Sequence, residues 1–246
     1  MAPPTRSPAS PTSRPTPTRA EATAAPRRAT ARTRLAGWAG RRRLTRRLVQ
    51  LYVGLIVYGA SAALMVQAHL GLDPWDVLHQ GVARHLGIPI GWIVIGVGAI
   101  VLLLWIPIRQ RPGLGTVSNV VVVGLAMNAT LWLVPAPDPL WSRWALLVGS
   151  VALNGAATGL YIGARLGPGP RDGLMTGIAA RGHSIRLVRT GIELAVLGAG
   201  FLLGGEVGFG TLLYAVAIGP LAHVFIPLFT VREPTPRSVD AGSPGD

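Results

Sequence analysis

The chain has 246 residues, of which 50% are hydrophobic and only 13% charged, with a mean hydropathy of +0.45. So little polar surface excludes a soluble globular domain of this length. The absence of cysteine excludes disulfides, thiolate metal sites and cysteine nucleophiles. The net charge of +13 does not indicate a basic domain, because 12 of the 23 basic residues, all arginines, lie in residues 1–47.

Residues 1–47 are rich in Pro, Ala, Thr and Arg, with Glu21 as their only acid. Such a composition cannot bury a core, so we expect a disordered cytoplasmic tail. The basic run Arg41–Arg47 abuts the first apolar stretch, where it would hold the helix end in the cytoplasm and contact anionic lipid headgroups. Nucleic-acid binding is not expected, because Trp38 is the only aromatic residue in the tail.

Long apolar stretches follow the tail, each about 20 residues long, which is the length that a helix needs to cross a bilayer. They are residues 48–68, 90–108, 115–135, 144–164, 186–204 and 209–229. Two further segments, 74–86 and 170–182, are too short to cross and have the length of re-entrant or interfacial helices. The sequence therefore predicts an all-α membrane protein with six transmembrane helices and two short re-entrant helices.

The chain contains an internal duplication. Residues 48–83 recur as 144–179 at a shift of 96, and Gly113-Leu114-Gly115-Thr116 recurs as Gly208-Phe209-Gly210-Thr211 at a shift of 95. Two membrane repeats are expected on this basis. The predicted organisation is a tail 1–47, repeat 1 at 48–143, repeat 2 at 144–231 and a short cytoplasmic tail 232–246.

The arginines predict the orientation of the repeats. With the N-terminus inside and six crossings, seven arginines fall in the short inside loops and two in the outside loops, which obeys the positive-inside rule. The inside set is Arg109, Arg111, Arg165, Arg171, Arg181, Arg186 and Arg189, and the outside set is Arg84 and Arg143. Three crossings per repeat is an odd number, so the second repeat enters from the opposite side and the repeats are predicted to be inverted, with both termini cytoplasmic.

Two acids, Asp76 and Asp172, occupy equivalent positions in the repeats, each two residues after a proline that starts a short helix. One interpretation is structural, because an acid in the first turn complements the positive helix end. The other is a cation or proton site, since carboxylates at membrane depth usually have a function. Asp73 would cap the first short helix, whereas Arg171 gives the second site a positive neighbour that the first lacks.

Glu193 is the one carboxylate inside a predicted span, and Arg189 precedes it by one helical turn. The two are expected to pair. Either they form a structural ion pair near the inner interface, or Glu193 serves a transport pathway or anchors a substrate. A separate stripe of small residues, Gly155, Gly159 and Gly163, is echoed by Gly59 in the first repeat. It predicts close packing between the equivalent helices 48–68 and 144–164, with homodimerisation as the alternative.

Three segments carry a family resemblance. They are Leu70–Gly81, Arg111–Thr116 and Gly167–Met175. They resemble the YczE/YyaS/YitT-type bacterial integral membrane proteins, in the YczE-like branch. The resemblance implies a multi-spanning protein of the bacterial plasma membrane, and some members of that family are associated with lipopeptide antibiotic production. It supplies no catalytic residues.

No catalytic motif is present, such as a nucleophile elbow, a P-loop or a zinc-protease helix. We therefore expect neither an enzyme nor a resident cofactor or metal. Two functional hypotheses remain. The first is a transporter for a small solute or an exported molecule that works by rocking of inverted repeats. The second is a membrane scaffold or accessory protein for a biosynthetic or secretion system.

The predicted topology can be tested by thiol labelling, because the chain has no native cysteine. Single cysteines at Arg84 and Ala136 should react with an impermeant reagent from outside, and those at Gln110 and Gly182 only from inside. Labelling of position 110 from outside would support a rival topology in which the two short helices also cross, and would remove the argument for inverted repeats.

Overall fold

The structure is a computed structural model that describes the backbone of residues 19–231 and side chains from residue 44. It forms two compact units, residues 1–45 and 46–246, and the account below concerns the second. The predicted tail 232–246 and residues 1–18 of the predicted disordered tail lie outside the description. The rest of that tail, from Arg19, belongs to the first helix.

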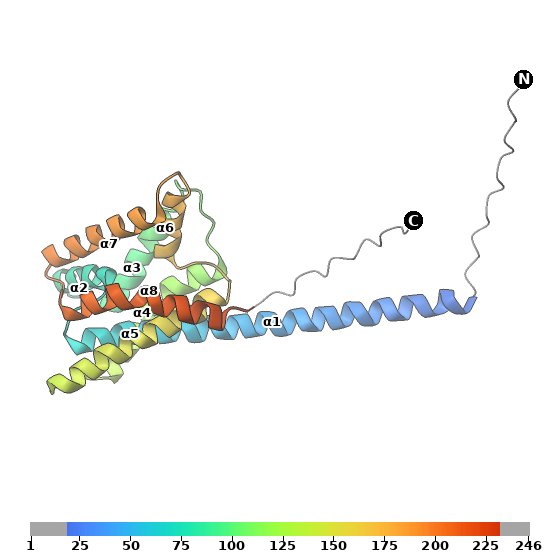
Figure 1. Cartoon of the computed structure of the whole chain (residues 1–246), viewed down its shortest axis with the longest axis horizontal. Coiled ribbons are helices and arrows are strands. Elements are labelled where there is room, and N and C mark those ends of the chain that lie inside the picture. Colours follow the sequence, from blue (N-terminus) through green and yellow to red (C-terminus); the bar gives the residue numbers. More distant parts are fainter. Residues whose placement is uncertain (1–18, 232–246) are drawn as a thin grey trace, which may run out of the picture. The chain divides into compact units, whose positions relative to one another are not determined.

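The described residues form eight helices and no strand (Figure 1). They are α1 (Arg19–Ala68), α2 (Pro74–Leu86), α3 (Ile90–Leu103), α4 (Leu114–Leu133), α5 (Leu140–Gly163), α6 (Pro170–Ala179), α7 (Ile185–Leu202) and α8 (Phe209–Phe229). The all-α prediction is confirmed. Both predicted short helices are present, as α2 and α6.

Four helical segments are long and apolar enough to cross a membrane: Leu44–Ala68, Leu114–Leu133, Leu140–Gly163 and Phe209–Phe229. A fifth span is formed if α2 and α3, bent by 115° at their junction, count as one. Helix α3, with 14 residues, is too short to cross a membrane alone, and α7 carries three charged side chains and is therefore not apolar enough. Length and composition thus establish four or five spans, and the prediction of six remains a prediction.

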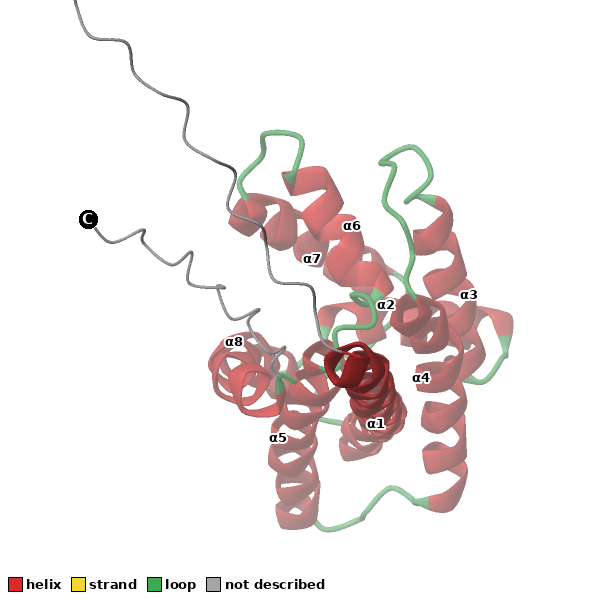
Figure 2. Cartoon of the chain, turned by 90° about the vertical axis from the view of Figure 1, so that its right-hand side faces the viewer, coloured by secondary structure: helices red, strands yellow, loops and turns green. Residues whose placement is uncertain are grey.

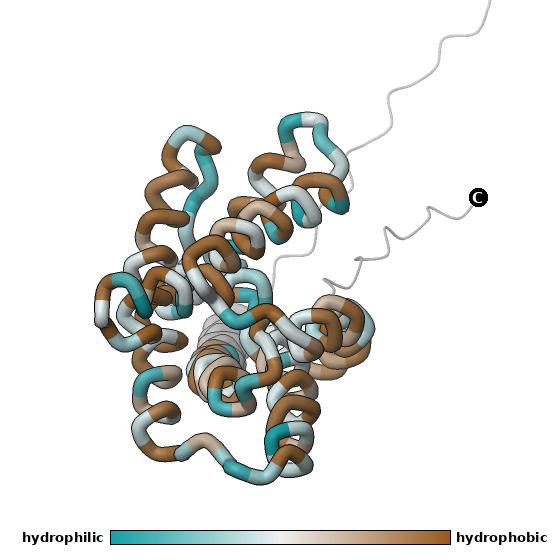
Figure 3. Tube along the Cα trace, turned by 90° about the vertical axis from the view of Figure 1, so that its left-hand side faces the viewer, coloured by the Kyte–Doolittle hydropathy of each residue, from teal (hydrophilic) through white to brown (hydrophobic). Residues whose placement is uncertain are grey.

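The outer surface of the helices is apolar, as expected for contact with lipid. Trp132 and Leu202 are each 85% exposed, and large apolar side chains are exposed on every helix from α3 to α8 apart from α6. The hydropathy colouring in Figure 3 shows hydrophobic residues along the outward faces of the helices. A membrane-embedded protein accounts for this surface, because in water it would drive aggregation.

The two repeats contact each other through reciprocal turns. The Leu-Gly turn before α2 is bonded to the Gly-x-Gly-Thr turn before α8, with Gly210 N donating to Leu70 O at 2.7 Å. The equivalent turn before α6 is bonded to the turn before α4, with Gly115 N donating to Leu166 O at 2.8 Å. A loop of each repeat is therefore held by the other repeat.

Glycine is required at the centre of each of these contacts. Gly71 and Gly167 have φ values of +108° and +129°, which disfavour any side chain. A Cβ on Gly71 would also meet the backbone of Gly208, and one on Gly167 would meet Gly113 and Thr116. The duplicated glycines of the sequence are thus explained by one backbone contact that is made twice.

Arginines reinforce the same exchange at the helix ends. Arg143, at the start of α5, donates from Nε to Ala68 O at 2.8 Å and so binds the C-terminus of α1. Arg47, its equivalent before the first span, donates from Nε to Ala164 O at 2.7 Å and binds the C-terminus of α5. A guanidinium is favoured there because helix C-termini carry negative partial charge.

Each short helix packs on a long helix of the other repeat, α2 on α7 and α6 on α3. The two contacts differ in the atoms that meet. A Cβ on Gly200 of α7 would meet the backbone of Val77 and Leu78 in α2, whereas one on Gly173 of α6 would meet the ring of Trp105, which follows α3. Trp105 Nε1 also donates to Pro170 O at 3.1 Å, which fixes the start of α6. Both contacts require a glycine, but only the second places it against a large side chain.

The predicted close packing of helices 48–68 and 144–164 is present at Gly54, where an added Cβ would meet the backbone of Tyr161, but the glycine stripe itself packs elsewhere. Gly155, Gly159 and Gly163 of α5 face Leu221, Phe225 and Phe229 of α8. Gly59 of α1 faces Val123 and Met127 of α4. In Figure 2 the spanning part of α1 lies between α4 and α5, with α8 beside α5. The glycines thus pack the first helix of each repeat against its last helix, α1 against α4 and α5 against α8. A glycine face lacks side chains and so lets the apolar partner helix approach closely.

The last two helices of each repeat pack differently. Helices α3 and α4 meet where Gly91 and Gly124 face each other's carbonyl oxygens, and Gly91 N donates to Asn128 Oδ1 at 2.8 Å. At the shift of 95, Arg186 stands in place of Gly91, and Gly219, in place of Gly124, has open space where a Cβ would lie. Helices α7 and α8 accordingly make few contacts with each other.

The closed contact between α3 and α4 predicts a marked effect of one methyl group. Gly91→Ala should destabilise the protein by about 1–3 kcal/mol, because its Cβ would overlap the Gly124 carbonyl. The matched control is Gly96→Ala in the same helix, which meets open space and should be neutral or slightly stabilising. Thermal unfolding in detergent measures both, and equal midpoints would contradict the account of this contact.

Candidate functional site

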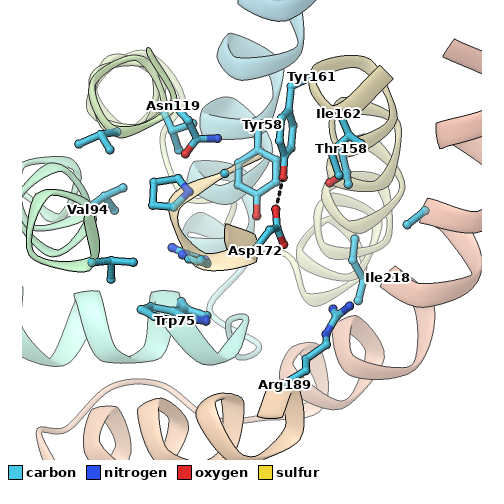
Figure 4. Close-up of a pocket in the computed structure, with 18 of the residues that line it drawn as sticks. Tyr58, Trp75, Val94, Asn119, Thr158, Tyr161, Ile162, Asp172, Arg189 and Ile218 are labelled. Carbon is cyan, nitrogen blue, oxygen red and sulfur yellow. Dashed lines mark hydrogen bonds between the residues drawn. The ribbon is translucent and has the colours of Figure 1, made fainter. Parts of the chain in front are cut away.

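A cavity of about 300 Å³ lies at the meeting point of the two repeats. Its walls come from α1, α2, α3 and α4 of the first repeat and α5, α6, α7 and α8 of the second. Figure 4 shows Asp172 and Tyr161 near the centre of the drawn residues, with Trp75 on one side and Arg189 on another. The reciprocal turns create this arrangement, because they direct the first residues of both short helices toward the centre.

Two acids from the first repeat surround one arginine from the second. Arg171 Nη1 lies 3.5 Å from Asp73 Oδ1, and Arg171 Nη2 lies 3.6 Å from Asp76 Oδ1. Both acids are buried. Asp73 is also the N-cap of α2 and accepts from the backbone N–H groups of Trp75 and Asp76. The predicted cap is thus confirmed, and Asp73 stabilises both a helix start and the partly buried guanidinium.

His79 and Trp75 complete the surroundings of Arg171. His79 Nδ1 is 2.9 Å from Asp76 Oδ1, one turn along α2. The Arg171 guanidinium lies 4.9 Å from the centre of the Trp75 ring, a distance at which a cation is attracted to the aromatic face. The indole N–H of Trp75 is buried and has no hydrogen-bond partner within the described part of the chain. Trp75 and Arg171 are equivalent residues of the two repeats, so they meet where the repeats adjoin.

Asp172 lies in a different environment from its equivalent, Asp76. It accepts a hydrogen bond of 2.7 Å from the Tyr161 hydroxyl and, among the residues that the structure describes, forms no ion pair. It stands in the first turn of α6, where the positive end of the helix dipole lies. Tyr58 packs edge-on to Tyr161 at 5.9 Å, so two rings stand beside this carboxylate.

The acids outnumber the arginine that faces them. Burial and the nearby Asp76 carboxylate raise the pKa of Asp73 to about 7, although Arg171 acts to lower it. One guanidinium thus faces two carboxylates, and Asp172 has no ion-pair partner among the described side chains.

The cavity reaches the surface between α7 and α8. Arg189, Gly219 and His223 line the cavity and are all exposed. This mouth lies at the helix pair that lacks the close packing of α3 on α4. The two equivalent helix pairs also differ in sequence, with Arg186 at the position of Gly91.

The structure brings together some of the residues that the sequence selected. Asp172, Arg171 and Arg189 line the cavity, and Asp76 reaches it through His79 and Arg171. Glu193 forms the predicted ion pair, with its Oε1 2.9 Å from Arg189 Nε, but stands behind that residue. The four selected glycines pack helices and do not line the cavity.

Sequence reasoning did not select Trp75, the three tyrosines or His79 as site residues. Tyr58, Tyr161, Tyr214 and Trp75 come from four helices, and no spacing along the chain relates them. A polar chain lies behind Tyr214, whose hydroxyl donates to Asn154 Oδ1 at 3.2 Å, while Asn154 Nδ2 donates to Ser61 Oγ at 2.9 Å. The one available signal was the placement of three tyrosines inside apolar spans, where a hydroxyl needs a partner.

Comparison with known proteins matches residues 45–227 to a family model described as a family of unknown function, DUF6198. This match covers about three quarters of the chain. The chain belongs to the family DUF6198. The family match begins near the first span and ends inside α8, so it contains every residue of the cavity.

Relatives of this DUF6198 chain are similar over most of their length. A Haemophilus influenzae Rd protein named "Uncharacterized protein" is 41% identical over 72% of this chain and 81% of its own. The Bacillus subtilis 168 "Uncharacterized membrane protein YczE" is 32% identical over 72% and 83%, and "Uncharacterized protein YyaS" of the same strain is 26% identical over 72% and 90%. The resemblance to YczE is thus confirmed, and the apolar spans agree with a membrane protein. No solved structure matches the chain.

The paired acids predict a strong and pH-dependent effect of removing the arginine. Arg171→Gln should lower the free energy of unfolding by about 3–5 kcal/mol at pH 8, because two buried acids lose their cation. Lowering the pH to 5 should restore part of this loss, since protonated carboxyls need no counter-charge.

Arg111→Gln, at an exposed arginine in the loop before α4, is the control and should behave as the wild type at both pH values. Unfolding in detergent at pH 5 and 8 makes the comparison. A loss that is the same at both pH values would show that Arg171 acts through packing and not through charge.

Proposed function

We propose that the protein is a membrane transporter for a small solute or an exported molecule, built from two inverted repeats, with the central cavity as its binding site. The observation that carries the proposal is the cavity itself. Both repeats contribute to it, it holds charged and aromatic side chains, and it reaches the surface on one side. Transporters with inverted repeats commonly bind their substrates where broken helices of the two repeats meet.

The reciprocal contacts support an inverted arrangement with six crossings. Each Leu-Gly turn binds the Gly-x-Gly-Thr turn of the other repeat, and each short helix packs on a long helix of the other repeat. Such an exchange is what a twofold axis in the membrane plane would generate. Helices α2 and α6 would then be short helices at opposite faces of the membrane, with their first residues toward its centre.

The alternative function is a membrane scaffold or accessory protein for a biosynthetic or secretion system. A scaffold needs no solvated interior, and its core would be filled by small apolar side chains. The cavity instead holds Arg171, Asp172 and His79. Burying such groups costs stability, and membrane proteins usually retain them where they serve a function, so the transporter is the better account.

The position of the mouth between α7 and α8 suggests the side of the membrane to which the cavity would open. With the N-terminus in the cytoplasm, α7 begins and α8 ends at the inner face, so Arg189 and His223 would lie in the inner half of the membrane. The closed contact of α3 and α4 would seal the outer half. We therefore treat the described conformation as inward-open, and transport requires a second conformation that opens outward.

Accessibility of the cavity from both sides tests this function. Thr158 lines the cavity, so Thr158→Cys should react with an impermeant maleimide quickly in inside-out vesicles and more slowly, but measurably, in right-side-out vesicles. Gln110→Cys and Arg84→Cys serve as inside-only and outside-only controls. Reaction of Thr158→Cys from one side alone would contradict alternating access and favour the scaffold.

A further inference from the structure

We propose that the cavity binds an organic cation with apolar substituents, whose charge lies at Asp172 among the rings of Tyr58, Tyr161 and Tyr214. This inference names the class of solute for the proposed transporter. It rests on the proposed function only for the idea that the bound ligand is transported. The residues that determine it come from both repeats and from four helices.

The charge of the site favours a cation. Arg171 faces two buried acids, Asp73 and Asp76, so it contributes no excess positive charge. Asp172 receives one hydrogen bond, from Tyr161, and has no ion-pair partner among the described side chains. A carboxylate that lines a cavity without an ion-pair partner attracts a cation that brings the missing charge.

The aromatic lining favours an organic cation over a bare metal ion. Three of the four tyrosines of the chain line the cavity, and Trp75 forms another wall. Ring faces attract alkylated ammonium groups, whereas metal ions require several oxygen ligands. Within the described residues, no group of three or more His, Asp or Glu side chains is placed to hold a metal ion.

The remaining walls match apolar substituents on such a cation. Val94, Val97 and Val101 of α3 and Ile218 of α8 also line the cavity. A volume of about 300 Å³ accommodates a molecule of roughly ten to fifteen non-hydrogen atoms, at the lower end of the range of ligand sites. Apolar groups of the ligand would gain free energy by leaving water for these side chains.

Features that would favour an anion are already compensated. Arg189 lines the mouth but pairs with Glu193 at 2.9 Å, so this pair carries no net charge. The unpaired indole N–H of Trp75 is a single neutral donor. A water molecule or a hydroxyl or ether oxygen of the ligand would satisfy it without any negative charge.

Calorimetric titration of the purified full-length protein in non-ionic detergent tests the ligand class. The probe is benzyltrimethylammonium, and the matched anion of similar size is benzenesulfonate. We expect the cation to bind and the anion not to bind. Absence of binding by the cation, or tighter binding of benzenesulfonate, would overturn the proposal.

Variants identify the anchor. Asp172→Asn should weaken binding of benzyltrimethylammonium by about tenfold or more, since it removes one partner of a shielded charge pair. Asp138→Asn, an exposed acid in the loop between α4 and α5, is the control and should bind as the wild type. Equal affinities of the wild type and Asp172→Asn would overturn the assignment.

A second pair of variants covers the case in which Asp172→Asn fails to fold. Tyr214→Leu should weaken cation binding by several-fold because it removes a ring, whereas Tyr214→Phe should retain binding because the ring remains. Equal binding by both variants would count against the aromatic cage. The titration measures binding without transport, so the two proposals can fail separately. Labelling of Thr158→Cys from one side alone, together with cation binding, would contradict the transporter and leave the ligand class standing. Labelling from both sides without cation binding would contradict only the ligand class.

Discussion

The structure depends on one backbone contact that is made twice, in which the Leu-Gly turn of each repeat lies against the Gly-x-Gly-Thr turn of the other. Two hydrogen bonds, Gly210 N to Leu70 O and Gly115 N to Leu166 O, close these contacts. Only glycine allows backbones to approach so closely. Because each turn begins a short helix, the contacts fix where α2 and α6 start, and they bring the acids of one repeat beside the arginine of the other. The cavity follows from this geometry.

Differences between the repeats determine how that symmetric frame becomes an asymmetric site. Trp75 and Arg171 are equivalent residues that stack on each other, while Asp76 and Asp172 have unlike partners. At the last helix pair, Gly91 allows α3 to approach α4, whereas α7 and α8, with Arg186 at the equivalent place, make few contacts. The duplicated fold thus has one closely packed helix pair and one open pair.

Much of this architecture could be predicted from the sequence, and the limits have physical causes. Apolar length located all eight helices: α2 and α8 have the predicted bounds, while α3 ends at Leu103, before Pro107, instead of at residue 108. Local spacing also predicted the Arg189–Glu193 pair and the Asp73 cap. The convergence of Asp73, Asp76 and Arg171 was not predictable, because it depends on contacts between residues almost 100 positions apart. The small-residue stripe predicted close packing but not its partner, since a flat face fits any neighbouring helix.

The most direct test of the reciprocal contact is the thermal unfolding of Gly113→Ala and Gly208→Ala in detergent. Neither glycine has a left-handed backbone, so each substitution tests only the space between the repeats. A Cβ on either would meet the carbonyl of the opposite Leu-Gly turn, whereas one on Gly149 of α5 would meet nothing. The account predicts that each variant lowers the free energy of unfolding by a similar amount, about 1–3 kcal/mol, which is the usual cost of overpacking. Gly149→Ala should cause no such loss. A loss in only one of the two variants, or in neither, would contradict it.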